Sequence, residues 1–148
     1  MKKKILLLVA LMGLVLVPTF AKSSDMSAGL ALGTINGVGF KYNLDKDLTL
    51  GGTLGLDVVT TGTLSVEAFG LYKVAEVEVQ KENFDINAGG GVAASFINDF
   101  NFSVLGMVEA SYSFKGDYPI DLLLRLEPGY TFGKAFVMHG SIQGLWRL

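Results

Sequence analysis

The sequence predicts an all-β protein, an eight-stranded antiparallel up-and-down β-barrel with the side-chain pattern of a transmembrane barrel. Three observations lead to this prediction. Apolar and polar residues alternate with a period of two along most of the chain, as they do in strands. Short polar or glycine-containing breaks divide this alternation into eight segments. One face of the segments carries bulky apolar side chains, whereas the other carries small and polar ones.

Residues 1–21 have the layout of a secretory signal peptide, and we expect cleavage after Ala21. Lys2, Lys3 and Lys4 precede an apolar run that is shorter than the roughly 20 residues of a membrane-spanning helix. A retained membrane anchor is the alternative. Cleavage removes three of the twelve basic residues, which leaves nine against fourteen acidic residues and a net charge of −5. Such an acidic chain is a poor candidate for binding nucleic acid.

Residues 22–148 suit a single domain, and its first four expected strands lie at 26–33, 37–44, 48–58 and 64–79. Breaks at 34–36, 45–47 and 60–62 separate them. In the fourth segment the alternation changes parity, because Val77 and Val79 fall on the opposite face from Val66 and Tyr72. A β-bulge near Val74–Ala75 accounts for this slip of one residue.

The other four strands are expected at 84–96, 100–114, 120–132 and 135–148, with turns at 80–82, 98–99, 115–117 and 133–134. The sixth segment shows the clearest alternation, with Val104 and Val108 on one face and Ser103 and Glu109 on the other. No interior stretch has a helical period. The expected outer loops, near 34–36, 59–62, 97–99 and 133–134, are all short.

The bulk of the two faces indicates which of them points inward. The interior of an eight-stranded barrel is only wide enough to be filled by its own side chains. The polar face consists largely of Gly, Ser, Thr and Asn, with Phe69, Leu105 and Met107 as larger fillers. We therefore expect the polar face inside and the apolar face outside. The alternative is a soluble barrel of lipocalin type, whose apolar face surrounds an apolar ligand.

Aromatic residues near the ends of the segments favour an apolar face that lies in a bilayer, because rings concentrate at the two membrane–water interfaces. The predicted aromatic girdle consists of Phe84, Phe96, Phe100, Phe102, Tyr112, Phe114 and Trp146. Segment lengths also fit the 9–11 residues or so of a tilted spanning strand.

In this pattern the chain resembles the small eight-stranded outer-membrane barrels, such as the OmpA membrane domain and OmpX, over essentially all of residues 22–148. Its final residues resemble the signal that these barrels present to their assembly machinery, here Gly144, Trp146 and Leu148. The family usually ends in Phe and has its glycine one place earlier, so the chain departs from both positions. The resemblance implies an outer-membrane location, contact with outer-membrane lipid, and transient binding to the barrel assembly machinery and periplasmic chaperones.

Ten charged residues fall on the predicted inner face, where each charge must be paired or hydrated. They are Lys41, Asp57, Glu67, Lys73, Asp85, Glu109, Asp121, Arg125, Glu127 and Arg147. Pairing of the last two segments about Gly133–Lys134 brings Asp121 near Arg147 and Glu127 near His139.

Pairing of the sixth and seventh segments brings Glu109 within diagonal reach of Arg125. We expect a cluster of Glu109, Arg125 and Glu127, faced across the lumen by Lys41 or Lys73, that closes the barrel to bulk flow. The alternative is a set of separate, hydrated charges in a partly filled cavity.

The segment His139-Gly140-Ser141 resembles the His-x-Ser arrangement of an outer-membrane lipid A deacylase, in which a base adjoins a nucleophile. That family has Asn after the Ser, where this chain has Ile142, and no acidic residue follows Ser141. Both side chains are also expected to face the lumen, away from lipid. We therefore expect no enzymatic activity. With one histidine and no cysteine, the sequence predicts no metal site and no cofactor.

The predicted role is structural, or a minor porin-like contribution to permeability. Charged residues gather at the breaks 45–47, 76–82 and 115–117, at the end of the barrel opposite the outer loops. A weak periplasmic partner is therefore expected to bind there, if the protein has one.

Overall fold

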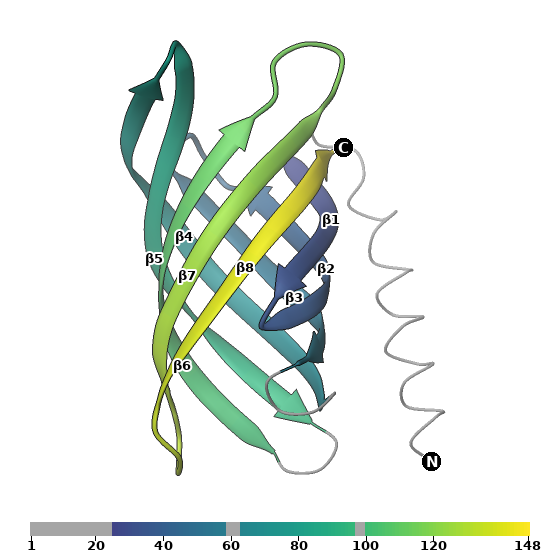
Figure 1. The fold of residues 1–148 in the computed structure, drawn as a ribbon, viewed down its shortest axis with the longest axis vertical. Coiled ribbons are helices and arrows are strands. Elements are labelled where there is room, and N and C mark those ends of the chain that lie inside the picture. Colours follow the sequence, from purple (N-terminus) through teal and green to yellow (C-terminus); the bar gives the residue numbers. More distant parts are fainter. Residues whose placement is uncertain (1–24, 59–62, 97–99) are drawn as a thin grey trace.

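The computed structural model describes residues 25–58, 63–96 and 100–148. The predicted signal peptide and the expected outer loops at 59–62 and 97–99 lie outside these residues. The described chain is a closed antiparallel barrel of eight strands in up-and-down order, as predicted (Figure 1). The strands are β1 (Met26–Gly33), β2 (Ile35–Asn43), β3 (Leu48–Asp57), β4 (Thr63–Val79), β5 (Glu82–Phe96), β6 (Asn101–Ser113), β7 (Ile120–Thr131) and β8 (Phe136–Arg147).

Hydrogen bonds between β1 and β8 close the barrel, with Ala28 opposite Trp146. The predicted bulge in β4 is confirmed, because the register between β4 and β5 shifts between Lys73 and Ala75. The bulge keeps Val77 on the outside of the barrel, where its side chain is exposed.

Two turns are tighter than the sequence predicts. β2 begins at Ile35, which pairs with Asp57, so the expected turn at 34–36 shortens to Thr34. Glu82 likewise pairs with β4, so Gln80 and Lys81 alone form the β4–β5 turn. Both residues have positive φ, 51° and 71°, as in the type I′ turns that suit the twist of a hairpin.

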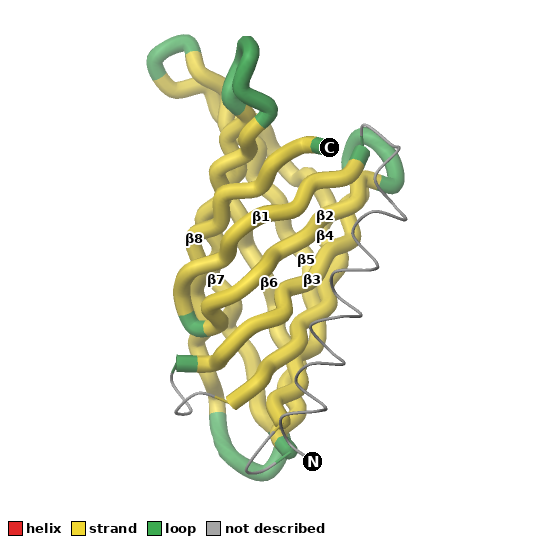
Figure 2. Tube along the Cα trace, turned by 90° about the vertical axis from the view of Figure 1, so that its right-hand side faces the viewer, coloured by secondary structure: helices red, strands yellow, loops and turns green. Residues whose placement is uncertain are grey.

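The two ends of the barrel differ (Figures 1 and 2). One end, here called the terminal end, holds Leu148, the β2–β3 turn, the β6–β7 loop and the β4–β5 hairpin, which rises above the rest of the barrel. The opposite end, here called the turn end, holds the β1–β2 and β7–β8 turns. Strands of 17 and 15 residues build the raised hairpin.

The polar face points into the barrel and the apolar face points outward, as the sequence predicts. Large apolar side chains are exposed around the outside, for example Leu30 and Phe100, each with 68% of its surface exposed. Phe69, Leu105 and Met107 are buried in the interior, where they pack together with Leu71 and Ala93.

Glycines on neighbouring strands leave space for the Phe69 side chain. A Cβ atom on Gly51 would lie 2.5 Å from the ring of Phe69, and one on Gly91 would lie 2.8 Å from the Phe69 Cβ. The narrow lumen therefore holds a phenylalanine ring because neighbouring strands carry no side chain there.

The aromatic residues form contacts in two groups at opposite ends of the barrel. At the terminal end, Tyr112 packs against Phe84 and Phe114, with ring centroids 5.2 and 4.9 Å apart. At the turn end, Phe96 packs against Phe100 at 5.5 Å, and Phe102 against Phe132 at 5.7 Å. Trp146 lies on the outside of β8, with 51% of its surface exposed.

Along β6 the two groups are ten residue-to-residue steps apart, from Phe102 to Tyr112. At about 3.3 Å per residue this distance is roughly 33 Å along the strand, or about 25 Å across a barrel whose strands tilt by about 40°.

The part of the chain that the structure describes contains no helix long and apolar enough to cross a bilayer.

Candidate functional site

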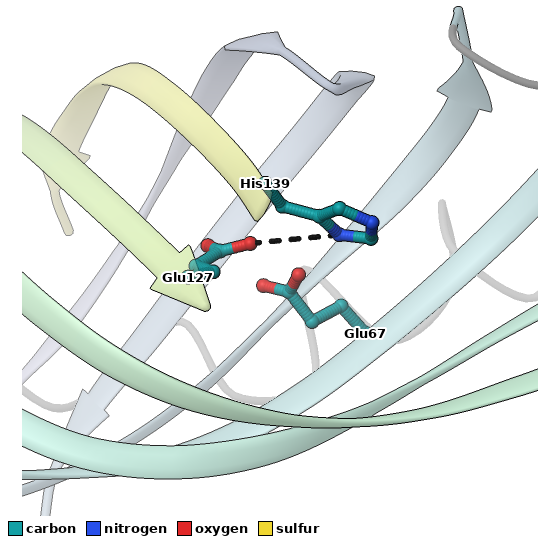
Figure 3. A group of neighbouring side chains, drawn as sticks. All are labelled: Glu67, Glu127 and His139. Atoms are coloured by element: carbon teal, nitrogen blue, oxygen red, sulfur yellow. Dashed lines mark ion pairs between the residues drawn. The ribbon is translucent and has the colours of Figure 1, made fainter. Parts of the chain in front are cut away.

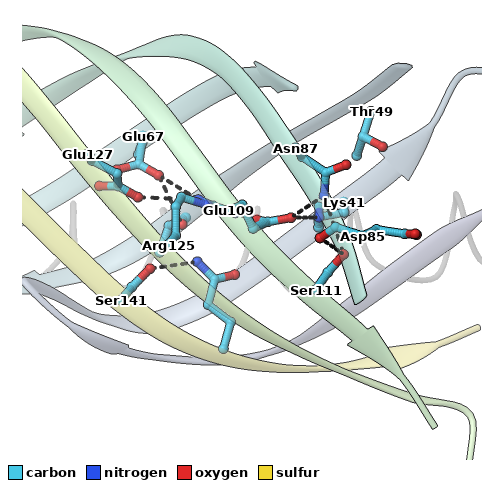
Figure 4. A network of polar contacts seen from close by, with 12 residues as sticks. Lys41, Thr49, Glu67, Asp85, Asn87, Glu109, Ser111, Arg125, Glu127 and Ser141 are labelled. Atoms are coloured by element: carbon cyan, nitrogen blue, oxygen red, sulfur yellow. Dashed lines mark hydrogen bonds and ion pairs between the residues drawn. The ribbon is translucent and has the colours of Figure 1, made fainter. Parts of the chain in front are cut away.

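The candidate site is a network of buried charged side chains in the middle of the lumen (Figure 4). Its members are Lys41 on β2, Glu67 on β4, Glu109 on β6, and Arg125 and Glu127 on β7. Alternation along each strand turns these side chains inward. Glu109 and Arg125 are fully buried, so the surrounding protein groups replace the water that would otherwise solvate them.

Arg125 lies at the centre of this network. Its Nε and Nη2 atoms donate hydrogen bonds to Oε2 of Glu109, at 3.0 and 2.8 Å. Its Nη1 atom donates to Oε1 of Glu67 at 3.2 Å and to Oε1 of Glu127 at 3.5 Å. The guanidinium also stacks on the ring of Phe69, with 3.9 Å between Cζ and the ring centroid. One cation therefore joins three carboxylates from three strands.

Glu109 extends the network toward the terminal end. Its Oε1 atom accepts a hydrogen bond from Nζ of Lys41 and another, at 3.2 Å, from Nδ2 of Asn87. The Glu109 carboxylate thus lies between two cations, Lys41 and Arg125. Multiple charged hydrogen bonds of this kind offset the desolvation of buried ions.

The structure brings most of the predicted cluster together and changes its details. Glu109 and Arg125 are direct cross-strand partners and not diagonal ones. Lys41 faces the cluster, whereas Lys73 lies nearer the terminal end and pairs with Asp85 at 2.7 Å.

The remaining predicted pairs lie in the last hairpin. Arg147 Nε is 3.5 Å from Oδ1 of Asp121, and Nδ1 of His139 is 4.0 Å from Oε2 of Glu127. The predicted cluster omitted Glu67, although alternation places this residue on the inner face. Alternation identifies an inward side chain, but it does not identify the strand that faces it across the lumen.

Two cavities lie on either side of the network. A cavity of about 470 Å³ opens at the terminal end, and Lys41, Lys73, Asp85 and Asp121 contribute to its polar wall. A much smaller one, about 10 Å³, lies toward the turn end beside Glu67 and Glu127. Lys41 lines the first space, and Glu67 and Glu127 line the second, so the charge network lies between them.

The His-x-Ser segment belongs to the same interior. Oγ of Ser141 accepts a hydrogen bond from Nε2 of Gln143 at 3.3 Å, and Gln143 is buried. Arg125 is the cross-strand partner of Ser141. These contacts give Ser141 a place in the polar packing of the lumen.

The residues of the predicted assembly signal lie on the last strand and immediately after it. Gly144 has open space where a side chain would begin, and Trp146 and Leu148 are exposed on the outside. The backbone amide of Leu148 donates a hydrogen bond to the carbonyl of Met26, which ties the end of the chain to β1.

The fold and the site define a class: closed eight-stranded barrels with an apolar exterior and an interior filled by an ion-pair network. Comparisons of the chain with models of protein families, with curated protein sequences and with solved structures find no match.

Proposed function

We propose that this protein is an integral barrel of the outer membrane of a double-membraned bacterium, with a structural role and a lumen closed to bulk flow. The observation behind the proposal is the outward belt of apolar side chains bounded by two groups of aromatic rings. Its height of about 25 Å along β6 matches the apolar band of outer-membrane barrels. A closed barrel also leaves no unpaired strand edge in lipid.

The interior supports the same proposal. A lipocalin-type barrel needs an apolar cavity for its ligand, whereas the middle of this lumen is occupied by Arg125, Glu109 and their partners. With the polar face inside, the exposed apolar surface lies on the exterior of the barrel. Lipid acyl chains can cover such a continuous apolar belt. The proposed orientation puts the terminal end in the periplasm. The exposed side chains of Trp146 and Leu148, at the end of the chain, would then be available to the assembly machinery and chaperones. The raised β4–β5 hairpin would be available to a periplasmic partner.

A charge placed in the middle of the belt tests the location. Val108 lies on β6 between the two aromatic groups, with 52% of its surface exposed. In vesicles of outer-membrane-type lipid we expect Val108→Arg to lower the free energy of unfolding by about 2–4 kcal/mol, the cost of Arg near a bilayer midplane. In a soluble barrel the same exposed substitution would change it by less than about 0.5 kcal/mol.

The matched control is Tyr118→Arg, in the β6–β7 loop beyond the belt, where the side chain is 69% exposed and the change should be near neutral. Electrophoresis in SDS adds a second readout, because we expect the unheated, folded barrel to migrate differently from the heated one. A protein that stays soluble without detergent and tolerates Val108→Arg would contradict the proposal and favour the lipocalin-like alternative.

The closed lumen is tested separately in planar bilayers. We expect the purified barrel to show little steady conductance, because the charge network occupies the bore. A large, steady conductance would contradict a closed lumen without affecting the membrane location.

A further inference from the structure

Glu67, Glu127 and His139 lie close together inside the barrel (Figure 3). They come from three strands, β4, β7 and β8, and the ligand atoms that they offer all lie within 4.8 Å of one another. The side chains of Glu67 and Glu127 are 3% and 4% exposed, and that of His139 is 14% exposed. The three residues therefore form a largely buried group of metal-ligating types, in which the sequence predicted the proximity of Glu127 and His139 but not the addition of Glu67.

His139 lacks the partner that its position calls for. Its Nδ1 atom is buried and has no hydrogen bond to any residue that the structure describes. The nearest carboxylate oxygen, Oε2 of Glu127, is 4.0 Å away, which is too far for a hydrogen bond. A buried polar atom without a partner is costly unless a water or an ion completes the site.

The charges of the interior point to a cation. In the buried network, two cations, Lys41 and Arg125, meet three carboxylates, those of Glu67, Glu109 and Glu127. Glu109 receives hydrogen bonds from both cations, whereas Glu67 and Glu127 share one nitrogen of Arg125. The one excess negative charge of the network therefore lies on Glu67 and Glu127, beside His139.

A small cavity adjoins the two glutamates of this group, and Gly140, the chain neighbour of His139, contributes to its wall. The cavity of about 10 Å³ is lined by Glu67 and Glu127, together with Thr34, Thr53 and Ser141. That volume is close to the minimum for one water molecule, and so it suits one small ion rather than an organic ligand. Thr34 forms the β1–β2 turn, so the cavity lies toward the turn end of the barrel.

We propose that Glu67, Glu127 and His139 bind one divalent transition-metal ion, for which Zn²⁺ is the reference. One imidazole and two carboxylates match the ligands that zinc takes at about 2.0–2.2 Å. Tetrahedral ligands at such bond lengths lie about 3.4 Å apart, so the three side chains close inward by about 1 Å on binding. Calcium, which takes 6–8 oxygen ligands, does not suit this set.

The site lies inside the barrel whether lipid or water surrounds the exterior, so this inference does not depend on the proposed membrane location. The result of the Zn²⁺-binding assay is therefore independent of the result of the Val108→Arg stability test.

The test is a titration of the purified, folded protein with Zn²⁺, without a histidine tag, followed by calorimetry and by NMR of the imidazole. Since the chain contains one histidine, its ring signals report on His139 alone. We expect one Zn²⁺ per chain and a shift of the ring signals, with no response to Mg²⁺ or Ca²⁺ at the same concentration. His139→Gln and Glu127→Gln should each weaken binding by more than about 100-fold, beyond the 10–100-fold typical of an outer-shell partner.

Asp121→Asn is the matched control, because it removes an inward carboxylate near the other end of the lumen and should leave Zn²⁺ affinity unchanged. Heat-dependent migration on SDS gels, or circular dichroism, checks that each variant is folded. His139→Gln keeps the test decisive if Glu127→Gln fails to fold.

Three results would overturn the proposal. The first is the absence of Zn²⁺ binding by the folded protein at millimolar concentration. The second is binding of equal affinity in His139→Gln, which would show that the ion sits elsewhere. The third is a positively charged imidazole at neutral pH that is unaffected by Zn²⁺, in which case a proton balances the buried carboxylates.

Discussion

Replacement of Arg125 by methionine removes the guanidinium at the centre of the interior network and keeps an unbranched side chain as far as the position of Nε. Methionine is unbranched and apolar, so it fills the space of the aliphatic part of Arg125. Glu67, Glu109 and Glu127 lose their shared cation, and only Lys41 remains to pair with one of them. All three carboxylates are at least nine-tenths buried, so water does not replace the lost partner without a rearrangement of the lumen.

Removal of one partner from a buried ion pair costs about 3–5 kcal/mol, because the remaining charge is uncompensated. We expect Arg125→Met to lower the free energy of unfolding by at least this amount, since one cation serves three carboxylates. Urea unfolding in lipid vesicles measures the change, and the fluorescence of Trp146, the one tryptophan in the sequence, reports the transition.

The matched variant combines Arg125→Met with Glu67→Gln and Glu127→Gln. It leaves the Lys41–Glu109 pair and removes the uncompensated charges, and replacement of a whole buried ion network by neutral groups is often close to neutral in stability. We expect the triple variant to be more stable than Arg125→Met alone. A loss below about 1 kcal/mol in the single variant, or a triple variant that is less stable than the single one, would refute this account of the network.

Two further predictions concern the packing and the turns. Gly51→Ala should cost about 1–3 kcal/mol, because the added Cβ meets the Phe69 ring at 2.5 Å, whereas Gly106→Ala, whose added Cβ lies 3.6 Å from its nearest neighbour, should cost much less. Equal effects in urea unfolding would contradict this packing. Hydrogen bonds from two backbone amides of its turn hold the pKa of Asp45 below its ordinary value. The Asp45 carboxylate therefore stabilises the folded state above its pKa in the unfolded chain, about 3.9. This contribution is lost as the pH falls through the lower pKa that Asp45 has in the folded protein. The stability difference between wild type and Asp45→Ala should accordingly shrink below about pH 4, and a difference that grows on acidification would contradict the assignment.

The strand content of this protein follows from its sequence because strand alternation is a local property. Apolar and polar residues alternate with a period of two in each segment, and the bulge appears as a change in this alternation before Val77. The small side chains of one face identify it as the interior of a narrow barrel. The alternation depends only on residues that are close in the sequence, and the choice of inner face depends only on side-chain volume. They are sufficient to predict eight strands, their order and the face that points inward.

The tertiary structure decided which inward side chains meet. Arg125 and Glu67 are 58 residues apart, and Lys41 and Glu109 are 68 apart, so their contacts depend on the tilt and stagger of the closed barrel. The same geometry places Lys41, and not Lys73, at the level of Arg125. It also brings Glu67 of β4 beside the Glu127–His139 pair, which the pairing of adjacent strands predicted, because Glu67 reaches this pair across the lumen and not along a neighbouring strand.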